Sequence, residues 1–151
     1  MNSQQENSME ARLKRLYFIL LTPVIAGFFV TYIIKIFTRT GVATPSGMSL
    51  MAPVLFVLAI SFGVAFPILW RTIFVNKNRN RKEITESELL RFEQITLCIA
   101  MVAPYASLIA FLFDIPQFHF YGTVLASLYA VYYFYPSQKR ITYEKRIFRA
   151  K

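Results

Sequence analysis

The segment CIAMVAPYASLIAFLFDIPQFHF, residues 98–120, gathers side chains that could do chemistry: the chain's one cysteine, one aspartate and one histidine. Asp114 and His119 could together bind a metal, a proton or a haem at one face of a membrane. One histidine and one carboxylate are too few ligands for a metal site without a partner chain. Cys98 alone forms neither an internal disulfide nor a cysteine-rich metal site, and we interpret it as a small core residue.

The depth of Asp114 favours a structural interpretation of the same segment. If residue 104 marks the middle of a membrane helix, Asp114 lies about 15 Å away, at the edge of the hydrocarbon. Asp-Ile-Pro-Gln then forms a tight turn, in which Pro116 stops the helix. We therefore expect Asp114 and His119 to mark an outer turn rather than a catalytic pair.

Prolines within the apolar stretches predict bends in the helices. Pro104 frees the carbonyl of Ala100, and the hydroxyl of Tyr105 requires an acceptor inside the bundle. Pro23 and Pro67 lie in similar surroundings, and these positions are candidate hinges or sites of transport.

Small residues recur at helical spacing and predict close helix packing. They are Ala59 and Gly63 in one stretch and Gly122, Ala126 and Ala130 in another. We favour packing within the bundle, although the same stripes could pack against a partner.

Four long stretches without charge must hold these residues in place. The pairs Arg15/Lys35, Arg39/Arg71, Glu93/Asp114 and Asp114/Lys139 bracket 19, 31, 20 and 24 residues. A membrane helix needs about 20 mostly apolar residues. The sequence predicts one all-α integral membrane domain over residues 1–151, an antiparallel bundle of four kinked transmembrane helices at about 16–36, 50–70, 93–113 and 118–135. Thr85 and Glu88 predict a capping box that starts the third helix near residue 85.

The distribution of basic residues predicts the orientation. The tail 1–14, the loop 71–92 and the tail 137–151, with Arg15, carry 15 of the 17 Lys and Arg residues, so both termini should be cytoplasmic. Residues expected to contact anionic lipid or a partner are Arg79, Arg81, Lys82, Arg140, Lys145 and Arg146. Residues 137–151 resemble a basic amphipathic segment, in which Ile141, Ile147 and Phe148 would contact lipid, although a solvated tail is the alternative. The charge is spread over three membrane-flanking segments, which argues against nucleic-acid binding.

The sequence contains no motif for catalysis, for a metal or for a cofactor, so we expect no enzyme. The central turns of the expected helices lack the charged groups that ion pumps use. We expect an accessory or assembly subunit of a larger membrane complex, most simply in a bacterial inner membrane, with other membrane subunits or further copies of itself as partners. The alternative is an oligomeric transporter or channel for a neutral or hydrophobic substrate. A quinone or lipid site among Tyr129, Tyr132 and Tyr133 is a third possibility, although an aromatic belt at the membrane surface explains these residues more simply.

Overall fold

The structure, a computed structural model, describes residues 2–38, 50–79 and 84–148, and every regular element in these ranges is a helix. The elements in chain order are α1 (Asn2–Thr38), α2 (Met51–Ile60), the π-helical segment η2 (Ser61–Ala65), α3 (Phe66–Asn78), α4 (Glu86–Ala100), α5 (Val102–Leu112), α6 (Gln117–Tyr133) and α7 (Gln138–Phe148).

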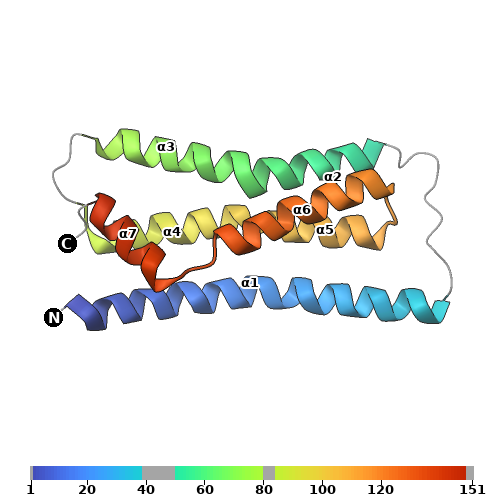
Figure 1. Cartoon of the computed structure of the whole chain (residues 1–151), viewed down its shortest axis with the longest axis horizontal. Coiled ribbons are helices and arrows are strands. Elements are labelled where there is room, and N and C mark those ends of the chain that lie inside the picture. The colour runs from blue at the N-terminus through green and yellow to red at the C-terminus, as the bar shows by residue number, and fades with distance from the viewer. Residues whose placement is uncertain (1, 39–49, 80–83, 149–151) are drawn as a thin grey trace.

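The long helices run alongside one another, and α7 crosses one end of them (Figure 1). Helix α5 contacts α1, α2 and α6, so it lies at the centre of the bundle. Helix α1 begins, α3 ends and α4 begins at the end where α7 lies, which we call the basic end (Figure 1). The opposite end, where α5 ends and α6 begins, we call the far end.

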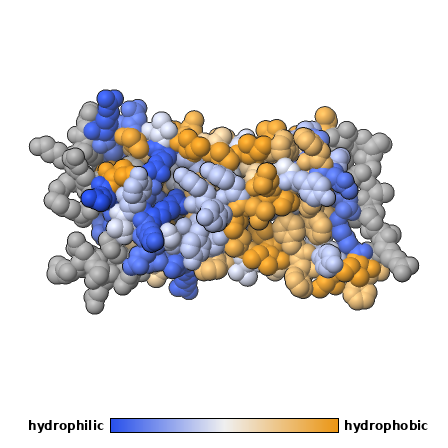
Figure 2. All heavy atoms as spheres, viewed as in Figure 1, coloured by the Kyte–Doolittle hydropathy of each residue, from blue (hydrophilic) through white to orange (hydrophobic). Residues whose placement is uncertain are grey.

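Three helical stretches are long and apolar enough to cross a membrane: Met9–Phe37, Met51–Asn78 and Glu86–Leu112. On the face that Figure 2 shows, hydrophilic residues gather mainly at the basic end, a smaller hydrophilic group lies at the far end, and apolar residues dominate between them. The described chain is all-helical. Its exposed apolar surface suits it to a membrane. The fourth predicted stretch also forms a helix, α6, which has 17 residues and is about 25 Å long.

The helices extend further than predicted at the basic end. Helix α1 begins at Asn2, inside the expected tail 1–14, and α3 continues to Asn78, inside the expected loop 71–92. Helix α4 begins at Glu86, as the sequence predicts. Thr85 occupies the N-cap position with extended backbone angles, but its side chain makes no capping hydrogen bond.

Pro67 lies two residues after the end of the π-helical segment, and the chemistry of proline explains that segment. Proline has no N–H to donate to the carbonyl of Gly63, and its ring would collide with that carbonyl in an α-helix. The wider π turn relieves both problems, and the N–H of Phe66 donates to the carbonyl of Ser61 instead.

Pro104 lies near the start of α5 rather than in the middle of an unbroken helix. Helices α4 and α5 are separated at Met101, whose ψ of −7° departs from the α-helical value. The ring of Pro104 conflicts with the carbonyl of Ala100, so the interruption falls where the proline requires it.

Small residues form the contact between η2, α5 and α6. A Cβ atom on Gly63 would lie 3.2 Å from the carbonyl oxygen of Ala126 and 3.3 Å from the Cβ of Ala103. Ala59 and Ala130 are fully buried nearby. The residues predicted to pack helices therefore meet inside the molecule, with Gly122 set against the ring of Phe56.

Two expectations were wrong. Cys98 is exposed on α4 rather than in the core, because it lies off the buried stripe that contains Leu97 and Ala100. Ile141 is buried rather than in contact with lipid, because α7 folds back onto the basic end.

Candidate functional site

An apolar cluster attaches α7 to the basic end. Ile141 of α7 packs with residues from α1, from the segment before α4 and from α4 itself: Met9, Leu13, Ile84, Leu89 and Phe92. Leu13 and Leu89 are almost completely buried. Ser137 caps α7, because its hydroxyl accepts a hydrogen bond from the backbone N–H of Arg140 at 3.3 Å.

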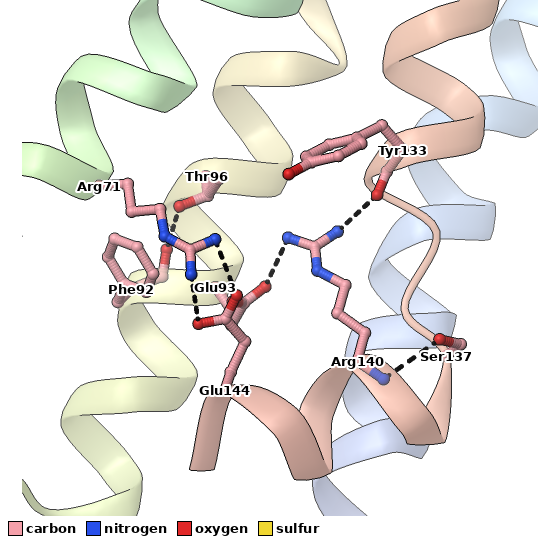
Figure 3. Close-up of polar contacts among 8 residues, drawn as sticks. All are labelled: Arg71, Phe92, Glu93, Thr96, Tyr133, Ser137, Arg140 and Glu144. Carbon is pink, nitrogen blue, oxygen red and sulfur yellow. Dashed lines mark hydrogen bonds and ion pairs between the residues drawn. The ribbon is translucent and has the colours of Figure 1, made fainter. Parts of the chain in front are cut away.

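Four charged residues from three helices surround this attachment, and we call them the ionic cluster: Arg71 of α3, Glu93 of α4, and Arg140 and Glu144 of α7 (Figure 3). Arg71 binds Glu144 through both of its terminal nitrogens, at 2.9 and 3.2 Å. This two-point geometry is the strong form of an arginine–carboxylate pair. The side chain of Glu144 is only 4% exposed, so its carboxylate is sheltered from water, whereas the side chain of Arg71 is 38% exposed.

Arg140 connects Glu93 to the end of α6. One terminal nitrogen lies 3.3 Å from Glu93, and the other donates to the carbonyl of Tyr133 at 2.9 Å (Figure 3). The guanidinium also lies 5.2 Å from the ring centre of Phe134. The side chain of Glu93 is 10% exposed, so Arg140 compensates a carboxylate that has lost most of its water.

A further ion pair, Lys145 with Glu86 at 2.7 Å, attaches the other end of α7 to the start of α4. The ionic cluster contains two positive and two negative side chains, which balance. Arg71, Glu93 and Arg140 line a cavity of about 40 Å³, which has room for about one water molecule. This arrangement suits a structural attachment of α7.

The predicted lipid or partner contacts lie in two kinds of place. Arg140 and Lys145 form ion pairs within the chain, whereas Arg79 and Arg146 are exposed. Arg81 and Lys82 lie outside the described residues. Other exposed cations of the described part of the chain are Arg12, Arg15, Lys77, Arg91 and Lys139.

Asp114 and His119 have separate surroundings at the far end. Asp114 forms an ion pair with Lys35, which also donates to the carbonyl of Phe111 at 2.5 Å. Asp114 has a φ of 47°, as expected for a tight turn. His119 packs edge-on against Phe56, and its Nδ1 has no hydrogen-bond partner in the described part of the chain.

The candidate hinge residues have structural contacts. Tyr105 donates to the carbonyl of Leu20 on α1 at 2.9 Å, which joins α5 to α1. Pro23 lies inside α1, which continues through it, and Pro67 and Pro104 each follow an irregularity. That these positions act as hinges stays a prediction.

Within residues 2–38, 50–79 and 84–148, no three His, Cys, Asp or Glu residues lie close enough together to hold a metal ion. The sequence interpretation missed the ionic cluster, because it assigned Arg140 to contacts with lipid or a partner and gave Arg71, Glu93 and Glu144 no role. Arg140 and Glu144, four residues apart beside the buried Ile141, carried a signal that this tail has a polar face with partners.

The fold and the site define a class, a small all-helical protein with membrane-length apolar helices and a charged attachment at one end. No protein family model, curated protein or solved structure matches the chain.

Proposed function

We propose that the chain is a four-span membrane protein with both termini in the cytoplasm, and that it serves as an accessory or assembly subunit of a larger membrane complex. The basic end is then the cytoplasmic face. This orientation follows from the positive-inside rule, because the exposed cations gather there and the far end has Lys35 paired with Asp114.

The position of α7 supports a crossing by α6. Helix α6 begins at the far end. Helix α7 packs against the start of α1 and forms an ion pair with the start of α4, both at the basic end. The chain between them must therefore return across the bundle. Helix α6 is short for the purpose, but mismatch of a few ångströms is accommodated by tilt or local thinning of the bilayer.

The use of polar groups inside the molecule is the observation that carries the proposal. Ser107, Thr123 and Ser127 donate to backbone carbonyls, and Tyr17 and Tyr105 join α1 to the helices beside it. Small residues fill the space between η2, α5 and α6. The groups left for recognition are the apolar surface and the exposed cations, which are suited to neighbouring membrane helices and to acidic partners.

A second candidate, an oligomeric transporter or channel for a neutral or hydrophobic substrate, draws support from the two helix irregularities. The π segment η2 packs against α4, α5 and α6, close in the bundle to the interruption at Met101. Segments of this kind occur often at functional sites. Flux in liposomes that is lost in Pro104→Ala or Tyr105→Phe would favour this candidate over the accessory subunit.

The test is gentle detergent extraction of a tagged copy at native expression, followed by native mass measurement and identification of what co-purifies. Foreign subunits in fixed stoichiometry are expected. Replacing Arg79, Arg81 and Lys82 with Glu should reduce the recovery of the foreign subunits. Replacing Arg140 alone should instead weaken the attachment of α7 to the rest of the chain. A homo-oligomer without partners would contradict the proposal.

A further inference from the structure

A groove of about 290 Å³ lies between α3 and α4 at the basic end. Its apolar lining comes from both helices: Trp70, Ile73 and Phe74 from α3, and Phe92 and Ile95 from α4. Phe74 and Phe92 are stacked, with ring centres 4.2 Å apart, and so form a firm contact between the two helices. Ile73 and Ile95 are 50% and 41% exposed, so the groove continues into the outer apolar surface.

The lining of the groove changes from apolar to polar toward the end of α3. Its polar lining residues are Lys77, Asn78, Glu88 and Arg91. Lys77 lies seven residues beyond Trp70 on α3, or about 10 Å along the helix. Arg91 lies about 6 Å from Ile95 on α4 in the same direction. The groove therefore has an apolar part toward the middle of the bundle and a polar part at the basic end.

The charges of the polar part favour an anion. Lys77 and Arg91 are exposed, and neither has an ion-pair partner in the described residues. Glu88 is the one acidic residue of the lining, which leaves an excess of one positive charge, and the exposed Arg79 at the end of α3 adds another. Two cations flanking an opening are suited to the oxygens of a phosphate.

Trp70 adds an independent observation. It lines the groove, and its Nε1 is buried without a hydrogen-bond partner in the described part of the chain. A buried indole N–H normally has an acceptor. An ester carbonyl of a lipid would accept this hydrogen bond once the indole turns toward the groove.

We propose that this groove binds one anionic glycerophospholipid. Its phosphate lies between Lys77 and Arg91, and part of one acyl chain lies along Phe74, Phe92 and Ile95. A lipid is favoured over a soluble anion because the apolar part of the groove opens onto the surface that faces hydrocarbon in a bilayer. The site is independent of whether the chain belongs to a larger complex.

The single tryptophan of the chain lines this groove, which makes a direct test possible. The full chain is reconstituted in phosphatidylcholine vesicles that contain equal small fractions of either acyl-brominated phosphatidylglycerol or acyl-brominated phosphatidylcholine. Bromine quenches tryptophan fluorescence at short range. Stronger quenching by the brominated phosphatidylglycerol is expected, and equal quenching by the two lipids would overturn the proposal.

A matched pair of variants separates the groove from general attraction to the surface. Each cation should contribute roughly a fivefold preference for an anionic headgroup. Lys77→Gln with Arg91→Gln should therefore bring the two quenching levels together. Arg12→Gln with Lys139→Gln removes the same charge from exposed positions outside the groove and should leave the preference intact. An equal loss in both double variants would show diffuse attraction and overturn the site.

Discussion

Arg140 contacts more of the basic end than any other side chain of the ionic cluster. It belongs to α7, binds Glu93 of α4 and donates to the last residue of α6. Removing one partner of a buried ion pair costs about 3–5 kcal/mol, and we expect the lower part of this range because Arg140 is 19% exposed. Arg140→Gln should lower the free energy of unfolding by about 3 kcal/mol, as measured by denaturant titration in detergent.

Two further variants make this prediction specific to the pair. Lys139→Gln changes an exposed neighbour and should alter stability by less than about 0.5 kcal/mol. Glu93→Gln combined with Arg140→Gln should cost less than the sum of the two single changes, because no carboxylate is then left uncompensated. Strict additivity would show that the two residues do not interact.

Asp114 combines an exposed ion pair with an unusual backbone conformation. Its carboxylate is 40% exposed, so the pair with Lys35 should contribute at most about 1 kcal/mol. Its φ of 47° costs an ordinary residue roughly 1–2 kcal/mol, whereas Asn tolerates this conformation. Asp114→Ala should therefore lower the melting temperature more than Asp114→Asn does. The reverse order would contradict a conformational role for this residue.

The turn at Asp114 could be predicted from its own residues, but its partner could not. Asp-Ile-Pro-Gln after an apolar run indicates a helix end, since Pro116 cannot continue the helix. Lys35 lies 79 positions away, on another helix. Only the packing of α1 against α5 brings the two together, and no local pattern encodes that contact.

At the scale of the elements, the contact of η2 with α5 and α6 depends on the absence of a side chain at Gly63. A larger residue would press on the backbone of Ala126, which moves only with the whole of α6. Gly63→Leu should destabilise the bundle by about 1–3 kcal/mol, the usual cost of overpacking. Ala65→Leu, at an exposed position of the same segment, is the control for thermal unfolding in detergent and should have little effect.

The sequence predicted the starts of α2, α4 and α6, but it placed the start of α1 too late and did not predict the role of α7. Hydropathy and the acidic residues after Thr85 placed the start of α4 correctly, because these signals act within one turn. The π segment before Pro67 was missed, since a proline in an apolar run is also compatible with a simple bend. The docking of α7 was missed because the side chains that Ile141, Arg140 and Glu144 contact in α1, α3 and α4 are far away in the sequence.

At the scale of the whole molecule, α7 fastens the ends of several helices to one another. It contacts α1 and α4 directly, and the ionic cluster extends these contacts to α3 and the end of α6. These contacts gather at one end, whereas packing by small residues stabilises the middle of the bundle. A molecule of this kind presents a fixed arrangement of exposed cations to its surroundings.

The proposed topology requires that Asn76 and Lys139 share one side of the membrane and that Gln117 lies on the other. All three are exposed, at the end of α3, in α7 and at the start of α6. With Cys98 replaced by Ser, a single Cys at position 117 should react with a membrane-impermeant maleimide in intact cells. A Cys at position 76 or 139 should react only after permeabilisation. Positions 117 and 139 flank α6. Labelling of both from the same side would therefore show that α6 does not cross the membrane and would contradict the proposed topology.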